Sequence, residues 1–179
     1  MKKSAYWLVC CLLLGSCSAS VERLALLEAN YLAARSSHAA AIEAYLEAVQ
    51  SEDFSAYGEY GLATLYLGMG EYTAALEGFD HAGERISNKP EAAVHKELQY
   101  RIAYNRGIAL FQESAFEAAA EAFRKALELD PARFEAKRNL ELSLLSQNRT
   151  RTTSSGAASL DIRDDAGPSD TVFDYIREK

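Results

Sequence analysis

The sequence has few of the residues that interrupt helices or crosslink a chain. Its 179 residues include 3 Pro, 10 Gly and 3 Cys. With so few breakers, long stretches are free to form helices, and neither a collagen-like chain nor a β-sandwich rich in Gly/Pro turns fits this composition. Three cysteines are also too few for a small domain held together by disulfides. The composition therefore predicts an all-α chain, and its length favours one domain.

Positive charge is scarce as well, since 19 Lys and Arg stand against 26 Asp and Glu, for a net charge of −7. A nucleic-acid partner would require a basic face, so no nucleic acid is expected. What is abundant is alanine, the strongest helix former, with 31 of the 179 residues. Apolar residues make up 49% of the chain, which is enough to bury a core.

Residues 1–16 have the anatomy of an export signal. Two lysines precede an apolar stretch that ends at Leu14 and is shorter than the roughly 20 residues of a membrane-spanning helix. The following Gly15, Ser16 and Cys17 complete a pattern that resembles the lipobox of bacterial lipoproteins. The resemblance implies cleavage before Cys17 and acylation of that residue, with no other cofactor. An ordinary secretory signal, cut slightly further on, is the alternative.

The lipoprotein resemblance also implies a location. The protein would be lipid-anchored in the bacterial envelope and face the periplasm, and Ser18 after the cysteine favours the outer membrane slightly over the inner one. The mature chain would keep 17 basic against 26 acidic residues. Attraction to anionic headgroups therefore cannot hold it, and the acyl chains on Cys17 must do so.

Beyond the signal, a small–aromatic–small triplet recurs at helical spacing. Its clearest copy is Ala119, Phe123 and Ala126, followed by Pro131. The other two copies are Ala75-Phe79-Ala82 and Ala41-Tyr45-Ala48. The two upstream copies are 34 residues apart and the last interval is 44. Small residues let two helices approach closely, and the aromatic ring fills the space between them.

The segment 100–133 resembles a tetratricopeptide repeat, a helix pair of 34 residues. The resemblance implies a right-handed α-solenoid of about three helix pairs plus a C-terminal capping helix. After a lipid-anchored linker over 17–21, we expect the solenoid over 22–146, with repeats at 22–55, 56–99 and 100–133 and the cap at 134–146. Because Pro90 suits a first helical position, we expect the ten extra residues to lengthen the first helix of repeat three by two or three turns.

The C-terminal part has a different composition. Residues 147–170 are mostly Ser, Thr, Gly, Arg and Asp, which predicts a disordered linker. Residues 171–179 place Val172, Phe173 and Ile176 on one helical face, which predicts a short amphipathic tail. A docking peptide and a frayed terminus are both compatible with this pattern.

Little in the sequence indicates catalysis. The three histidines have no partner four residues away and no neighbouring cysteine, so we expect no metal site. No nucleophile motif or glycine-rich phosphate loop is present. We therefore expect a protein without enzymatic activity and without catalytic residues.

The repeat resemblance instead implies a concave groove lined by the first helix of each repeat. Tyr and Arg, which are favoured anchors at interfaces, recur at the family's ligand-contacting positions. The expected groove residues are Arg23, Asn30, Tyr57, Tyr60, Thr64, Arg101, Tyr104, Ile108 and Phe111, with Arg138 from the cap. The alternative for Tyr60, Tyr104 and Phe111 is that they simply pack between helices.

These features together predict a membrane-anchored interaction scaffold for an envelope protein or peptide. One alternative is a solute-binding helper of a transporter, with an aromatic pocket enclosed on all sides. Another is a structural lipoprotein that forms a homo-oligomer and buries its groove. An open groove favours the protein or peptide partner.

Overall fold

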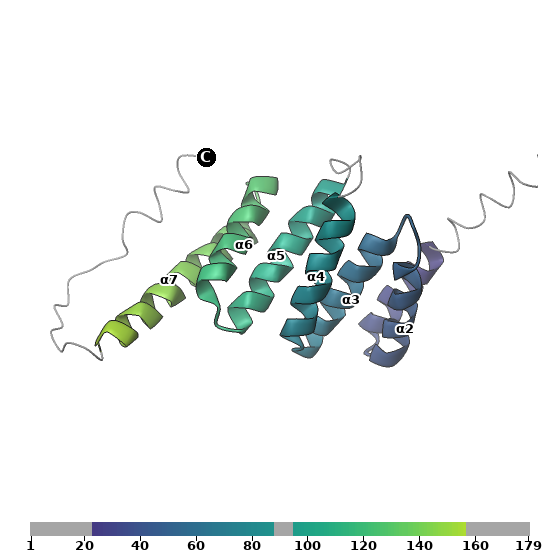
Figure 1. Ribbon diagram of the computed structural model, residues 1–179, viewed down its shortest axis with the longest axis horizontal. Helices are drawn as coiled ribbons and strands as arrows, with labels where there is room; N and C mark the ends of the chain where they lie inside the picture. The colour runs from purple at the N-terminus through teal and green to yellow at the C-terminus, as the bar shows by residue number, and fades with distance from the viewer. Residues whose placement is uncertain (1–22, 88–94, 157–179) are drawn as a thin grey trace, which may run out of the picture. The chain divides into compact units, whose positions relative to one another are not determined.

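The computed structural model describes residues 23–87 and 95–156, and within these ranges it contains helices and turns but no strand (Figure 1). Residues 23–34 form the N-terminal helix. The helices that follow are α2 (His38–Val49), α3 (Ser55–Met69), α4 (Tyr72–Ser87), α5 (Lys96–Gln112), α6 (Phe116–Leu129) and α7 (Phe134–Gly156). The predicted all-α class is confirmed. None of the helices described is long and apolar enough to cross a membrane.

Helices that follow one another in the chain pack together, as α2 does on α3, α3 on α4 and α6 on α7. The turn inside each predicted repeat contains one residue with left-handed backbone: Ser36 (φ 57°), Gly70 (φ 81°) and Ser114 (φ 62°). A glycine adopts this conformation without steric cost, whereas a serine adopts it at some cost. These positions are again 34 and 44 residues apart, so the turns keep the spacing of the buried triplets.

The chain divides into two compact units, one up to Leu98 and one from Gln99 onward. We call their described parts, residues 23–87 with 95–98 and residues 99–156, the N-terminal unit and the C-terminal unit. The first two predicted repeats make up the N-terminal unit. The C-terminal unit contains most of α5 together with α6 and α7.

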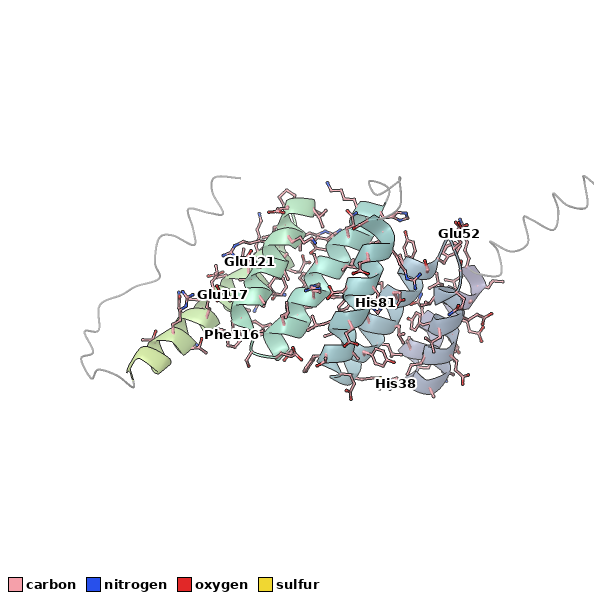
Figure 2. The ribbon with its side chains drawn as sticks, in the orientation of Figure 1. His38, Glu52, His81, Phe116, Glu117 and Glu121 are labelled. Atoms are coloured by element: carbon pink, nitrogen blue, oxygen red, sulfur yellow. The ribbon has the colours of Figure 1, made fainter. Side chains whose placement is uncertain are left out.

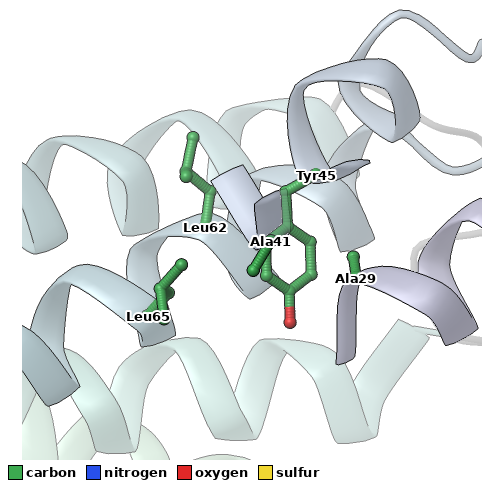
Figure 3. Close-up of a cluster of buried hydrophobic side chains, with 5 residues drawn as sticks. All are labelled: Ala29, Ala41, Tyr45, Leu62 and Leu65. Atoms are coloured by element: carbon green, nitrogen blue, oxygen red, sulfur yellow. The ribbon is translucent and has the colours of Figure 1, made fainter. Parts of the chain in front are cut away.

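In the N-terminal unit the core forms around Tyr45, which packs with Ala29, Ala41, Leu62 and Leu65 (Figure 3). The ring of Tyr45 lies so close to α3 that a Cβ on Gly61 would come within 2.2 Å of its Cε1 atom. Only a residue without a side chain allows this approach. The second triplet of this unit, centred on Phe79, is fully buried as well.

In the C-terminal unit Phe123 has the corresponding role. It packs with Ala119, Ala120 and Leu140, and a Cβ on Gly107 would come within 2.6 Å of its Cε1 atom. Leu140 comes from α7, whose Ala136 and Ser143 are also buried. The structure thus places α7 on α6, where the sequence predicted a capping helix.

The predicted end of the cap, at residue 146, is wrong: α7 continues ten residues further, to Gly156. Hydroxyl side chains accompany this extension. The Oγ1 atom of Thr150 donates to the Gln147 carbonyl at 2.8 Å, and that of Thr152 donates to the Asn148 carbonyl at 2.6 Å. Bonds to their own helix satisfy these groups without a tertiary core. The rest of the expected linker and tail, 157–179, lies outside the described residues, as do residues 1–22 with Cys17.

The expectation of a long first helix in repeat three is also corrected. α5 begins at Lys96 and is only two residues longer than α3, whereas α4 is four residues longer than α2. The last turn of α4 is held by Ile86, which is fully buried, and by Ser87, whose hydroxyl donates to the Gly83 carbonyl at 2.9 Å. Four of the ten extra residues therefore extend the second helix of repeat two. Pro90 lies outside the described residues.

Candidate functional site

The three histidines lie at separate places in the fold. His38 begins α2 and His81 lies just past the middle of α4, far apart in the chain and on different helices (Figure 2). His95 instead pairs with a tyrosine, its Nδ1 atom lying 3.1 Å from the Tyr57 hydroxyl. Over residues 23–87 and 95–156, no three His, Cys, Asp or Glu side chains gather in a way that would hold a metal ion.

Of the five groove residues predicted in the N-terminal unit, two are exposed and in contact with other side chains of the unit. Asn30 accepts a hydrogen bond from the Tyr45 hydroxyl at 2.7 Å, which ties the N-terminal helix to α2. The guanidinium of Arg23 lies 5.8 Å from the centre of the Phe54 ring. Both residues therefore help to hold neighbouring elements together.

The other three, on α3, have similar internal contacts. The half-buried Tyr57 bonds to His95, and the Tyr60 ring centre lies 6.0 Å from that of Phe79. The hydroxyl of Thr64 donates to the Tyr60 carbonyl at 2.8 Å, within its own helix. All three therefore make contacts within the unit, two with other side chains and one with its own helix backbone.

In the C-terminal unit Tyr104 lies between two rings. Its centre is 5.9 Å from that of Tyr100, in a stacked arrangement, and 5.7 Å from that of Phe123, edge to face. Its hydroxyl accepts a hydrogen bond from Nδ2 of Asn139 on α7, at 3.0 Å. This contact joins α5 to α7 and fixes the Asn139 carboxamide.

A hollow of about 280 Å³ adjoins this contact, between α5, α6 and α7. Its lining is Ile108, Phe111, Gln112, Phe123, Asn139 and Leu142. We call it the α5–α7 pocket. It opens to solvent, because Gln112 and Leu142 are exposed. The Phe111 ring on one wall is held by Phe116, whose ring centre is 5.2 Å away.

The pocket brings together two predicted groove residues, Ile108 and Phe111. Arg101 and Arg138 are exposed on α5 and α7 and do not line it. Sequence reasoning missed Asn139 and Leu142, although both lie on the capping helix one and four residues after Arg138. Their spacing of three residues, which puts them on one face of a helix, was the available signal.

The two units differ sharply in charge. The N-terminal unit has 4 basic against 11 acidic residues, whereas the C-terminal unit has 9 basic against 7 acidic residues. Two of the three helices around the pocket are cationic: α5 has three basic residues and one acidic residue, and α7 has four and two, whereas α6 has two basic and three acidic residues. The pocket therefore lies in the part of the described chain that attracts negative charge.

Two groups on α5, Tyr100 and Arg106, have pKa values that are shifted by burial. Burial raises the pKa of Tyr100, an effect that the nearby Arg133 partly offsets. The Arg133 guanidinium lies 4.6 Å from the centre of the Tyr100 ring and pairs with Asp130 at 2.7 Å. Burial also lowers the pKa of Arg106. The contacts of Arg133 brace the turn between α6 and α7.

Helix pairs that repeat the same buried triplet and the same turn define an α-helical repeat protein. Residues 100–132 match the family model of the tetratricopeptide repeat. That match and the structural neighbours support a tetratricopeptide-repeat (TPR) protein. A search of curated proteins by sequence finds no match.

Solved structures with the same fold are TPR domains. The first TPR domain of the human RPAP3 protein superposes with a TM-score of 0.62 at 17% identity, covering 74% of this chain and 96% of that one. The Sgt2 TPR domain from Aspergillus fumigatus gives 0.57 at 22% identity, covering 82% and 91%. The first TPR of Spaghetti (RPAP3), bound to the HSP90 peptide SRMEEVD, gives 0.56 at 20% identity, covering 77% and 94%. These likenesses establish the fold.

Proposed function

We propose that this protein is a lipid-anchored TPR scaffold that holds a protein or peptide partner in the bacterial envelope. The observation that carries the proposal is the α5–α7 pocket, an open apolar hollow on a helix-pair repeat. Proteins with this repeat are in general interaction modules without catalysis, and we propose no enzymatic role here.

The size and lining of the pocket favour a peptide over a small solute. At about 280 Å³ the pocket falls just below the 300–1,000 Å³ typical of small-molecule sites. Such a volume suits one or two side chains. The apolar floor of Phe123 and Ile108 can take an aliphatic or aromatic side chain, and the amides of Gln112 and Asn139 can bond to a main chain. A TPR neighbour that binds a peptide supports the same class of partner.

The lipid anchor at Cys17 belongs to the proposal on the strength of the sequence pattern alone. Acyl chains on Cys17 would confine the scaffold to the bilayer and raise its local concentration for an envelope partner. The lipobox pattern and the following Ser18 support the periplasmic side of the envelope, with the outer membrane slightly favoured. The covalent lipid would be the only non-protein group.

The direct test is to place a charge in the pocket of the full-length lipoprotein. Leu142→Asp should weaken capture of a crosslinked envelope partner about 10- to 100-fold, because an apolar contact is lost and a carboxylate is desolvated. Leu46→Asp is the matched control: Leu46 on α2 is 46% exposed, and Leu142 is 42% exposed. Both variants should keep the circular dichroism and melting temperature of the parent. Equal capture by the two variants would contradict the proposal.

The anchor is tested separately with Cys17→Ser. This variant should leave the membrane fraction and still retain partner binding in solution, because Cys17 is far in sequence from the pocket. If Cys17→Ser remains in the membrane fraction, the lipoprotein part of the proposal is wrong and the scaffold part is unaffected.

A further inference from the structure

The α5–α7 pocket has an occupant available within the same chain. We propose that the segment 170–179 (DTVFDYIREK) docks into this pocket in cis and competes with the external partner. This inference rests on the proposed function, because it takes the pocket to be a peptide site. Three observations support it: the chemistry of the segment, the length of chain that connects it to α7, and the charge on both sides.

The chemistry of the segment matches that of the pocket. Within ten residues it has Val172, Phe173 and Ile176, apolar side chains that fall on one side of a helix. The pocket offers an apolar floor of Phe123 and Ile108, with the exposed Leu142 at its rim. An amphipathic segment that lays its apolar face into a groove between helices is a common mode of peptide recognition.

The connecting chain has the required length. The pocket residue Leu142 and the end of α7 at Gly156 are 14 residues apart, which corresponds to about 21 Å along a helix. Fifteen residues separate Gly156 from Val172, and a coil of that length spans about 19–23 Å. The segment can therefore return from the end of α7 to the pocket without stretching its connection.

The charges on the two sides are opposite. Residues 157–179 have 6 acidic against 3 basic residues. Of the three helices around the pocket, α5 and α7 each have a net charge of +2 and α6 has a net charge of −1. The N-terminal unit, with 11 acidic against 4 basic residues, would repel the same segment. Charge therefore directs the segment to the C-terminal unit.

A tethered segment acts at a local concentration of the order of a millimolar. If the same segment binds as a free peptide at about 0.1 mM, the tethered copy weakens that binding about tenfold. An external partner must overcome the same competition. The C-terminal segment would thus set a threshold for partner capture.

The experiment compares the full chain with a chain that ends at Gly156, the last residue of α7. A fluorescently labelled DTVFDYIREK peptide is titrated with each protein, and its anisotropy is recorded. The shortened chain should bind the peptide, and the full chain should bind it about tenfold more weakly. Full-length chain with Phe173→Ser and Ile176→Ser should recover the affinity of the shortened chain, because its own segment no longer fills the pocket.

Site specificity is tested in the shortened chain, where Leu142→Asp should abolish peptide binding and Leu46→Asp should not. A peptide of the same composition in scrambled order should not bind. Cis docking also requires that the tenfold weakening be independent of protein concentration. A weakening that grows with concentration, together with a doubled mass in sedimentation, would assign the pocket to a second copy and overturn the proposal.

Equal binding by the full and shortened chains, or no binding by the shortened chain, would also overturn it. These outcomes are distinct from failure of the proposed function. If Leu142→Asp still abolishes partner capture in the full-length lipoprotein, the pocket remains a partner site without its internal competitor. If only the internal competition is observed, the pocket serves the chain's own segment and the scaffold proposal fails.

Discussion

The two units repeat one aromatic contact and differ in what surrounds it. In the N-terminal unit Tyr60 meets Phe79 with ring centres 6.0 Å apart, and in the C-terminal unit Tyr104 meets Phe123 at 5.7 Å. Tyr104 follows Tyr60 by 44 residues in the sequence, and Phe123 follows Phe79 by the same number. Around Tyr104, however, the chain adds a stacked ring, Tyr100, and the carboxamide of Asn139 from the capping helix.

The difference between the units shows which positions specify the fold and which specify the surface. The buried triplets are the same type in both units, because helix packing tolerates only small residues beside an aromatic ring. The charged residues differ between the units, and the net charge is −7 in the N-terminal unit and +2 in the C-terminal unit. The pocket and the cationic helices α5 and α7 both belong to the C-terminal unit, and for this reason the proposed partner site lies there.

The largest effect that we expect is the loss of stability when the central ring of either unit is removed, and it shows whether the two units unfold independently. Phe79→Ala and Phe123→Ala should each cost about 3–5 kcal/mol, because each removes a fully buried ring. Hydrogen exchange measured by mass spectrometry should show faster exchange in α4 for the first variant and in α6 for the second. If either substitution accelerates exchange equally in both units, the chain unfolds as one body and the division into two units has no energetic meaning.

A smaller loss of stability is expected when a methyl group is added where the helix backbone lies against an aromatic ring in each unit. Gly61→Ala would push a Cβ against the Tyr45 ring, and Gly107→Ala would push one against the Phe123 ring. Each should cost about 1–3 kcal/mol in chemical denaturation. Gly68→Ala is the matched control: its Cβ would meet no atom within 4 Å, so it should stabilise α3 by up to about 1 kcal/mol. A loss of stability at Gly68 as large as the losses at Gly61 and Gly107 would show that contact with a ring is not what requires glycine at these positions.

Much of the fold was predictable from local spacing. The nine triplet residues, from Ala41 to Ala126, are all buried as the repeat pattern indicated. The pocket was harder to predict, because Asn139 and Leu142 reach it only after α7 has packed on α6. The end of α7 was missed for another reason. Thr150 and Thr152, which suggest a linker by composition, bond to their own helix backbone.

The predicted groove residues show a further limit of sequence reasoning. Spacing placed Tyr60 and Tyr104 at ligand-contacting positions, yet their rings contact the core rings Phe79 and Phe123. A half-buried tyrosine can pack its ring against the core and expose its hydroxyl to a partner, and a sequence pattern does not separate these two roles. Leu142, exposed at the pocket rim, is therefore a cleaner probe of binding than either tyrosine.

The smallest effect that we expect is a loss of stability at alkaline pH, caused by ionisation of the two buried tyrosines Tyr45 and Tyr100. Burial raises the pKa of Tyr45 above 10.0, with a further contribution from Tyr60. Burial likewise raises the pKa of Tyr100. Because both pKa values are higher in the folded state than in the unfolded state, the neutral form is favoured by folding. The stabilisation is complete below pH 10 and is lost as the pH rises through the folded-state values. Unfolding experiments across this range should show stability falling above pH 10, and less steeply in Tyr45→Phe.

The two tyrosines differ in their surroundings, because Arg133 lies beside Tyr100 and no cation contributes to the pKa shift of Tyr45. The Arg133 guanidinium, 4.6 Å from the Tyr100 ring centre, favours the phenolate and offsets part of the effect of burial. Arg133→Met should therefore raise the pKa of Tyr100 further and leave that of Tyr45 unchanged. Phenolate absorbance, recorded as a difference against Tyr100→Phe and Tyr45→Phe, separates the two titrations. An equal shift at both tyrosines would mean that Arg133 acts through the stability of the whole chain, and the electrostatic distinction between the units would then be lost at this site.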